Sequence, residues 1–380
     1  MNTLDEYIRA AIQERKLQNT HRSLTVNPLL TDFASNDYLG FARNKSIHSL
    51  THESSMVSLG GSGSRLITGN TFEYEELEKK IAQFHKAEAS LIFNTGYMAN
   101  IGLLQTIVQR GDTILYDELS HASIRDGIRL SFANAFAFAH NNIKELEKKL
   151  KVAKGKIIVV TESVYSMDGD VAPLLEIIKL CEKFKASLIV DEAHATGIYG
   201  KNGEGLVVEL GIEQKVFARV VTFGKALGCH GAAVLGSQHL VDFLVNFSRS
   251  FIYTTALPHT SIIAIDRAYS ELIESKNIMS QLHQKINYFK LHTQNISEKI
   301  IPSTSPVQAL IIGHIEKTKQ IAKRIREQGF LIKEILSPTV PKGTERIRIC
   351  IHVFNTENEI QELANILNKE LTLSEKATHA

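Results

Sequence analysis

One lysine stands in a run of small and apolar residues, 222–228 (TFGKALG), at the end of an apolar stretch. A second apolar stretch, 187–191, ends in Asp191 and is followed by His194. The amine of a lysine forms a Schiff base with an aldehyde, and removal from water lowers its pKa toward the reactive neutral form. A carboxylate can keep a pyridine nitrogen protonated. Lys225 and Asp191 together therefore predict a pyridoxal phosphate (PLP) site, in which His194 can reach the phenolic oxygen of the ring.

Each of these residues also has a structural interpretation. Lys225 could be a surface lysine in a loop, although the flanking apolar strands and glycines argue against this. Asp191 could cap a helix after a strand, which is a common use of aspartate. The pair is more specific than either residue alone.

Two glycine-containing segments suit a phosphate group. Gly96 lies at an expected strand-to-helix junction, where backbone N–H groups can bind an anion. An ordinary glycine turn is an equally good interpretation. The segment 60–70 (GGSGSRLITGN) resembles a phosphate-binding loop but lacks the Gly-Lys-Ser/Thr ending of a Walker A motif, and surface loops look similar.

Other polar residues follow expected strands. His121 could stack its flat ring on a cofactor, or cap a helix. Ser166 could form a hydrogen bond with a ring substituent, or belong to a polar turn. The guanidinium of Arg348 matches a carboxylate, whereas Arg346 suits a solvated strand face.

Composition limits the class of protein. The chain has 380 residues, of which 43% are apolar and 22% charged, so it can form a large core and disorder is not expected. A net charge of +2 without a long basic run gives no indication of a nucleic acid or anionic membrane partner. The three cysteines are scattered and indicate neither disulfides nor a zinc site. With no signal peptide or apolar span expected, we predict a cytoplasmic enzyme.

Apolar strands alternate with helical patterns in the middle of the chain, which predicts an α/β fold with a mainly parallel sheet and helices on both faces. Ligands of such sheets bind beyond the carboxyl ends of the strands. Helices are also expected at 3–18, capped by Thr3, and at 171–184, capped by Asp170. The expected strands are 89–93, 113–116, 134–138, 156–161, 187–191, 219–223 and 232–236.

The chain is expected to have three parts. Residues 1–50 would form an N-terminal helix and arm, residues 51–260 a PLP-binding large domain, and residues 261–380 a smaller α+β domain.

The chain resembles the α-oxoamine synthase family of fold-type I PLP-dependent enzymes over nearly its whole length. Motifs in the same order carry this resemblance: NDYLG (36–40), GSGSRLITGN (61–70), FNTGYMAN (93–100), SHAS (120–123), SMDGD (166–170), DEAHATG (191–197), TFGKALG (222–228), YTTALP (253–258) and GTERIRI (343–349).

The resemblance implies a role for each matching residue. Lys225 would be the Schiff-base lysine and catalytic base, Asp191 the partner of the ring nitrogen, His194 the partner of the phenolic oxygen and His121 the stacking residue. No catalytic role is implied for Cys229 or His230. The other implied contacts are Gly96, Tyr97 and Thr222 to the phosphate, Thr254 from the second subunit of a homodimer with shared active sites, and Arg348, Asn36 and Arg22 to substrates.

Within the family, segments 225–236 and 249–258 are most similar to members that make 8-amino-7-oxononanoate for biotin. These members condense L-alanine with a pimeloyl thioester of coenzyme A or acyl carrier protein, with loss of CO2. Alternatives within the family are glycine-using members, such as 2-amino-3-ketobutyrate ligase (glycine C-acetyltransferase) or 5-aminolevulinate synthase, and a sphingolipid-type palmitoyltransferase. Alternatives outside it are a PLP aminotransferase or aldolase and a non-catalytic PLP-fold binding protein.

Overall fold

The computed structural model describes residues 3–26, 29–44 and 60–376, with side chains described as far as residue 371. By compactness the chain divides into two units, which are described separately. The smaller unit comprises residues 1–35, 167–169 and 282–380, and the larger unit residues 36–166 and 170–281. The sequence-based boundaries at residues 50 and 260 stay predictions, and the first of them lies outside the described residues.

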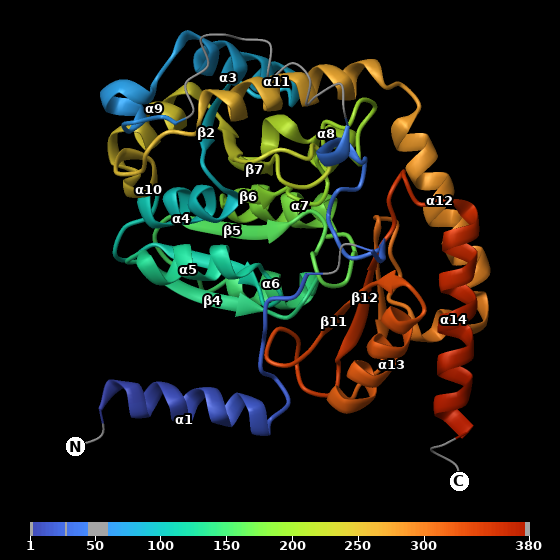
Figure 1. The fold of residues 1–380 in the computed structure, drawn as a ribbon. Coiled ribbons are helices and arrows are strands. Elements are labelled where there is room, and N and C mark those ends of the chain that lie inside the picture. Colours follow the sequence, from blue (N-terminus) through green and yellow to red (C-terminus); the bar gives the residue numbers. More distant parts are fainter. Residues whose placement is uncertain (1–2, 27–28, 45–59, 377–380) are drawn as a thin grey trace. The chain divides into compact units, whose positions relative to one another are not determined.

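The larger unit is built on one sheet (Figure 1). Its strands are β2 (Ala89–Phe93), β3 (Thr113–Asp117), β4 (Asn134–Phe138), β5 (Ile157–Glu162), β6 (Ser187–Asp191), β7 (Ala218–Thr222) and β8 (Ala232–Gly236). Within the described residues, the strand order is β2-β8-β7-β6-β5-β3-β4. Only β8 runs against its neighbours, because it pairs antiparallel with both β2 and β7 while the other described pairs are parallel. The predicted mainly parallel α/β fold is confirmed.

Helices connect these strands and cover the sheet. They are α3 (Phe72–Phe84), α4 (Gly96–Thr106), α5 (Ala122–Leu130), α6 (Ile143–Leu150), α7 (Leu174–Phe184), α8 (Leu206–Glu209), α9 (Gln238–Phe247), α10 (Arg249–Ile252) and α11 (His259–Glu274). Shorter helical turns lie at η1 (Phe41–Arg43), η2 (Arg65–Gly69) and η3 (Glu213–Lys215).

The sheet is buried on both faces except at its edge strand β4, whose first three residues are exposed, and this burial explains the continuous apolar runs in the sequence. On β5, Ile158 and Val160 join a core with α4, α5, α9 and α10, while Val159 between them is buried on the opposite face. On other parts of the sheet α6 contacts β3 and β4, and α7 contacts β6. Each fully buried Val, Leu or Ile contributes about 1.5–3 kcal/mol. This packing fixes the strand ends that carry polar residues.

The smaller unit has an antiparallel sheet in the order β11 (Lys333–Ile335), β12 (Arg346–Cys350) and β9 (Val307–Ile311). A parallel pair joins β1 (Thr31–Asp32) to β10 (Phe330–Leu331). Its helices are α1 (Leu4–Leu17), η4 (Gln294–Lys299), α13 (Ile315–Glu327) and α14 (Glu357–Lys376), and α12 (Ile278–His292) begins in the larger unit and ends here. The predicted smaller α+β part is thus present.

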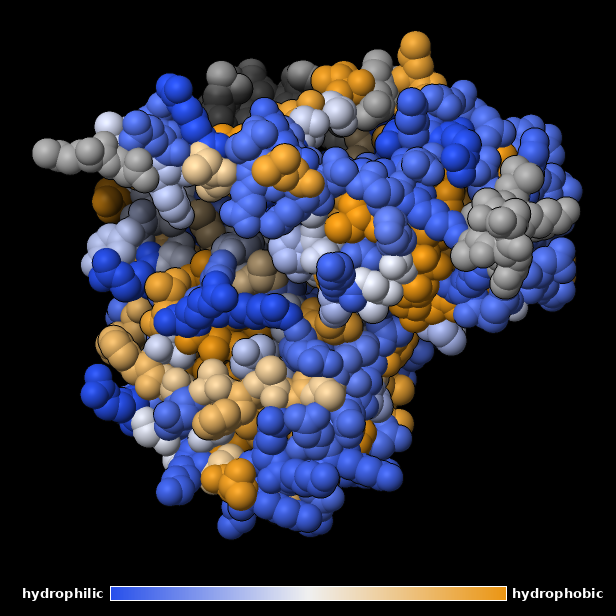
Figure 2. All heavy atoms as spheres, turned by 90° about the horizontal axis from the view of Figure 1, so that it is seen from below, coloured by the Kyte–Doolittle hydropathy of each residue, from blue (hydrophilic) through white to orange (hydrophobic). Residues whose placement is uncertain are grey.

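Helix α1 has the predicted cap but no buried residue. Thr3 Oγ1 accepts a hydrogen bond from Glu6 N at 3.3 Å, and Glu6 Oε2 accepts one from Thr3 N at 2.7 Å. The apolar side chains of Leu4 and Tyr7 are exposed. In Figure 2, hydrophobic residues (orange) gather in patches among hydrophilic ones (blue) on the face seen from below. Among the helices that the structure describes, we find none with a stretch suited to span a bilayer.

Two local predictions are wrong. Helix α7 begins at Leu174 and not at residue 171, because the carboxylate of Asp170 binds His140 and does not cap the helix. Arg346 does not lie on a solvated strand face. Its side chain is buried and forms an ion pair with Asp168 in the same unit.

Candidate active site

A cavity of about 260 Å³ lies in the larger unit, among the segments that follow strands β2, β3, β5, β6 and β7. This is the carboxyl edge of the parallel strands, where ligands of such sheets bind. Eight of the residues predicted for the site line the cavity: Asn36, Gly96, Tyr97, His121, Asp191, His194, Thr222 and Lys225.

The other four predicted residues are not among those that line this cavity in the described part of the chain. Ser166 and Thr254 belong to the larger unit. Arg348 and Arg22 belong to the smaller unit, where Arg348 lies buried on β12 and Arg22 Nη2 donates a hydrogen bond to Thr339 Oγ1 at 3.0 Å.

Asp191 is held in place by two donors at the end of β6. Asn100 Nδ2 donates to Asp191 Oδ2 at 2.7 Å, and Ala193 N donates to Asp191 Oδ1 at 2.9 Å. The carboxylate is buried, and Lys225 lies half-buried in the turn after the adjacent strand β7. Lys225 and Asp191 thus both line one cavity.

The ring of His194 is oriented from the NDYLG segment. Tyr38 Oη lies 2.7 Å from His194 Nδ1 and also donates to Asn36 Oδ1 at 3.0 Å. Tyr38 is fully buried, so its hydroxyl is fixed between these two partners. Tyr38 therefore connects a cavity-lining amide to the cavity-lining histidine.

His121 caps helix α5 with its ring nitrogen. Its Nδ1 accepts from Ser123 N at 3.2 Å and lies 2.8 Å from Ser123 Oγ. Burial lowers the pKa of His121, and the charge of Lys225 lowers it further while that of Asp191 opposes the shift. His121 is therefore neutral around pH 7.

Glu162, at the end of β5, brings a second carboxyl group into the cavity. Its Oε1 accepts from His121 N at 2.6 Å, and its Cα is paired in register with that of Asp191. Burial raises the pKa of Glu162 to about 8, with the charge of Asp191 adding to the shift and that of Lys225 opposing it. The group is therefore protonated around pH 7.

Gly96 begins helix α4 and lies against Thr222. A Cβ at Gly96 would come within 2.6 Å of Thr222 Cγ2, so the close approach requires glycine. Thr95 Oγ1 accepts from Met98 N at 3.1 Å, which caps the helix. The backbone N–H groups of Gly96 and Tyr97 are at the helix N-terminus, where an anion is favoured.

The glycine-rich segment 60–70 is used differently. Arg65 Nη1 and Nη2 donate to Glu78 at 2.7 Å and 3.0 Å, and its guanidinium lies 4.0 Å from the centre of the Tyr74 ring. Asn70 Oδ1 accepts from Arg65 Nε at 2.7 Å. These contacts bind the arginine of this segment to other parts of the fold. They explain the segment without a phosphate-binding role.

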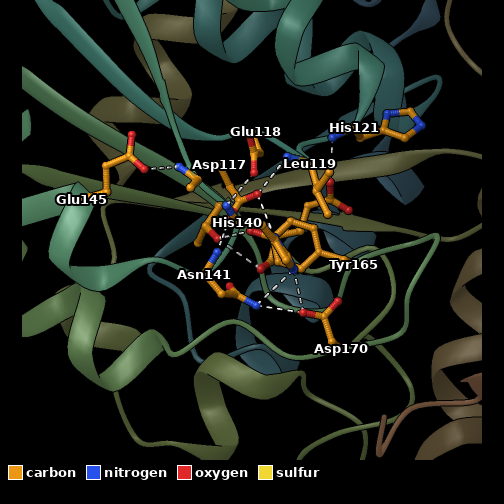
Figure 3. Close-up of polar contacts among 12 residues, drawn as sticks. Asp117, Glu118, Leu119, His121, His140, Asn141, Glu145, Tyr165 and Asp170 are labelled. Atoms are coloured by element: carbon orange, nitrogen blue, oxygen red, sulfur yellow. Dashed lines mark hydrogen bonds and ion pairs between the residues drawn. The ribbon is translucent and has the colours of Figure 1, made fainter. Parts of the chain in front are cut away.

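A separate, partly buried network joins the ends of β3 and β4 to the segment before α7 (Figure 3). His140 Nδ1 lies 2.9 Å from Asp117 Oδ1, and His140 Nε2 lies 2.7 Å from Asp170 Oδ2. The ring of Tyr165 packs edge-on against His140 at 4.5 Å. Burial lowers the pKa of His140, but the hydrogen bonds and charges of Asp117 and Asp170 outweigh it and raise the pKa to about 9.

The sequence interpretation gave no role to four residues around the cavity: Tyr38, Asn100, Ser123 and Glu162. All four stand in or next to the segments that carried the family resemblance. The signal that could have identified them in the sequence was a polar residue on an expected buried helix face or at an expected buried strand end. Their partners come from distant parts of the chain, so the signal did not identify what they bind.

Comparisons with known proteins agree with this geometry. Residues 29–367 match the family described as aminotransferase class I and II. The chain belongs to this family. The 8-amino-7-oxononanoate synthase of Emericella nidulans is 38% identical, over 98% of this chain and 97% of its own. The predicted family resemblance is confirmed.

Solved structures of this family have the same fold. The 8-amino-7-oxononanoate synthase of Francisella tularensis has a TM-score of 0.77 and 27% identity, covering 91% of this chain and 98% of that chain. A structure of SPT with PLP internal aldimine has a TM-score of 0.89 and 25% identity, covering 97% and 98%.

The groups that line the cavity suit PLP. The sequence already predicted this cofactor, because the amine of Lys225 can form a Schiff base with an aldehyde. A lysine amine, a buried carboxylate and a helix N-terminus with a required glycine match an aldehyde, a pyridine nitrogen and a phosphate. The hydrogen bonds from Asn100 and Ala193 hold the Asp191 carboxylate in a fixed position for the pairing with that nitrogen.

Proposed function

We propose that the chain is an 8-amino-7-oxononanoate synthase of biotin biosynthesis, a PLP-dependent acyltransferase. It joins L-alanine to a pimeloyl thioester and releases CO2 and the thiol carrier. The observation that carries this proposal is the meeting of Lys225, Asp191, His194 and His121 in one cavity. The chain is also 38% identical, over nearly its whole length, to a curated enzyme of that name.

When bound, PLP supplies a protonated ring that absorbs the negative charge that develops on the α-carbon of the amino acid. Lys225 would hold the cofactor, and its amine would remove the α-proton and later return one. Asp191 would keep the pyridine nitrogen protonated, and His194 would contact the phenolic oxygen. Gly96, Tyr97 and Thr222 would bind the phosphate.

The reaction needs no oxidant or reductant, because each bond that forms is matched by a bond that breaks. The α-carbon of alanine forms a bond with the thioester carbonyl carbon of the pimeloyl group, and the carbon–sulfur bond breaks to release the thiol. The carboxylate of the amino acid then leaves as CO2, and the α-carbon takes up a proton in its place. The product is 8-amino-7-oxononanoate.

Residues outside the cavity lining would complete the substrate site. Arg348 would hold the carboxylate of alanine through its bidentate guanidinium. Asn36 and Arg22 would contact the substrates, and Ser166 would contact the cofactor ring. Thr254 would reach the site of the second subunit in a homodimer.

The test is an assay of free thiol with purified, PLP-loaded protein. Alanine with pimeloyl-CoA, or with pimeloyl acyl carrier protein, is expected to release thiol much faster than glycine with acetyl-CoA. Faster release with glycine and acetyl-CoA would instead identify a glycine-using enzyme. Absence of release with every pair, despite bound PLP, would favour a binding protein.

The variant that tests the role of Lys225 in the same assay is Lys225→Ala. It is expected to lose activity by several orders of magnitude, because both the cofactor anchor and the base are removed. If Lys225→Ala released thiol at the wild-type rate, Lys225 would not be the base.

A further inference from the structure

A chain of buried polar side chains connects Asp191 to His121. Asn100 Nδ2 donates to Asp191 Oδ2 at 2.7 Å and to Ser123 Oγ at 3.0 Å. Ser123 Oγ lies 2.8 Å from His121 Nδ1. Asn100 and Ser123 are only 3% and 1% exposed, so water does not compete for these hydrogen bonds.

The direction of each hydrogen bond in this chain follows from what its partners can donate and accept. The carboxylate of Asp191 only accepts, so the amide nitrogen of Asn100 must face it and not the amide oxygen. The same nitrogen donates its second hydrogen to Ser123 Oγ. Ser123 N donates to the same ring nitrogen, His121 Nδ1, at 3.2 Å, so Nδ1 is an acceptor and the hydroxyl of Ser123 donates its own proton to it.

The direction of these bonds fixes the protonation of His121. Its Nδ1 accepts from both the hydroxyl and the backbone N–H of Ser123, so Nδ1 carries no proton. In a neutral imidazole the remaining proton then resides on Nε2. His121 can therefore donate a hydrogen bond from Nε2, and protonation at Nδ1 would break the hydrogen bond from Ser123 N.

We propose that Asn100 and Ser123 are positioning residues that hold His121 as the neutral, Nε2-protonated tautomer and tie its ring to Asp191. The hydrogen bonds do not depend on any assignment of function, whereas their role in catalysis rests on the proposed function. Asp191, which would pair with the ring nitrogen of the cofactor, and His121, which would stack on the ring, are thereby oriented together. His121 acts as a donor and leaves proton transfer to Lys225.

Charged and titratable groups around His121 come from several elements. Asp191 ends β6 and Lys225 follows β7, while Asp126 lies on α5, the helix that His121 caps. Glu162 contacts the His121 backbone from the end of β5. The charges of Asp191 and Asp126 favour a charged imidazole, whereas burial and the charge of Lys225 oppose it, and the donors to Nδ1 act in the same direction as burial.

The test compares Ser123→Ala with Ser120→Ala by NMR of full-length protein labelled with ¹⁵N in its histidine rings. Ser120 lies in the same turn and is buried, but its hydroxyl has no hydrogen-bond partner among the described residues. The signals of His121 are identified as those lost in His121→Asn. Spectra are recorded across the pH range, before and after loading with PLP.

We expect wild type and Ser120→Ala to show the Nε2-protonated tautomer with a pKa below about 6.5. In Ser123→Ala the pKa of His121 should rise by about one unit, which is of the order of one lost hydrogen bond. Asn100→Ala should raise it by less, because Ser123 keeps its hydroxyl proton but loses the partner that orients it.

An Nδ1-protonated His121 in wild type would overturn the proposal. So would an unchanged pKa in both Ser123→Ala and Asn100→Ala, provided that circular dichroism shows at least one of them folded. If one variant fails to fold, the other still decides. Because the tautomer is read without substrate and also without PLP, failure of this proposal is separate from failure of the proposed enzyme activity.

Discussion

At the scale of single residues, the cavity holds two carboxyl groups at adjacent strand ends, and they differ in the hydrogen bonds that they accept. Asp191 has two hydrogen-bond donors, whereas Glu162 has the single donor from His121 N at 2.6 Å. In a buried site, the charge of one carboxylate makes the ionisation of a neighbouring carboxyl group less favourable in free energy. Burial and Asp191 accordingly raise the pKa of Glu162 to about 8.

We predict that Glu162 makes the protein less stable as pH rises. The native state keeps this proton until about pH 8, while the unfolded chain loses it near 4.5, so the free energy of unfolding should fall between these values. In Glu162→Gln, a neutral isostere, the fall should become smaller, and the variant should be the more stable protein above about pH 8. Urea unfolding at a series of pH values measures this.

The control is Glu88→Gln, because Glu88 is an exposed carboxylate of the same unit. It should leave the pH dependence as in wild type. An identical pH dependence of unfolding in Glu162→Gln and wild type would show that Glu162 is already ionised in the native state.

A second prediction at this scale concerns Tyr38→Phe. Loss of the hydroxyl 2.7 Å from His194 Nδ1 leaves the histidine ring without this fixed partner. PLP should then bind about 2- to 10-fold more weakly, as expected for one hydrogen bond. Fluorescence titration with PLP measures the affinity. Tyr74→Phe is the control, since its buried hydroxyl donates to Leu257 O outside the cavity lining, and an equal loss in both variants would contradict a specific role for Tyr38.

At the scale of elements, His140 connects the ends of two strands to the segment that leads into α7 (Figure 3). Asp117 ends β3 and also accepts from the backbone N–H groups of Leu119 and Asn141. Asp170 accepts from His140 and from Asn141 Nδ2 at 2.8 Å. A protonated His140 between two carboxylates therefore holds these elements together.

We predict that His140→Gln destabilises the protein most at low pH. The pKa of His140 is raised from 6.5 to about 9, so its contribution is fully present below pH 6.5 and is lost as pH rises through about 9. Because removal of one partner leaves buried charges unpaired, the loss at pH 6 should be about 3–5 kcal/mol. Urea unfolding at pH values from 6 to about 10 measures the difference between variant and wild type.

The control for this variant is His239→Gln, because His239 is exposed on α9. Its unfolding free energy should differ little from that of wild type at every pH. A loss in His140→Gln that is the same at low and high pH would indicate that His140 acts by packing and not by charge.

Each predicted strand is present. Apart from the exposed edge strand β4, the strands were predictable because burial on both faces requires uninterrupted apolar runs. The cavity residues at the strand ends followed from the order of the motifs. The start of α7 was not predictable, because Asp170 could cap a helix as well as bind His140, and only the fold brings that histidine near. Arg346 was misjudged for the same reason, since its partner Asp168 lies far away in sequence.

At the scale of the whole molecule, the larger unit leaves apolar side chains exposed beside Thr254. Tyr253 is 72% exposed and Ile67 is 77% exposed. Their segments are joined because Ala256 N donates to Gly63 O at 2.9 Å and Ser64 forms a bridge with Thr255. Exposed apolar groups that gather in this way are typical of a protein interface. Such a surface suits the homodimer proposed for this chain.

We therefore predict that Ile67→Asp weakens dimerisation and, with it, activity. A carboxylate buried in an apolar interface would lose its water without gaining a partner, which should raise the dissociation constant by about 100-fold or more. Light scattering after size exclusion should give about twice the mass of one chain for wild type and a concentration-dependent shift toward one chain for Ile67→Asp. Leu24→Asp is the control, because Leu24 is fully exposed but belongs to the smaller unit. If Ile67→Asp kept the mass and activity of wild type at nanomolar concentration, this surface would not form the interface, and the contribution of Thr254 to a second subunit would have to be abandoned.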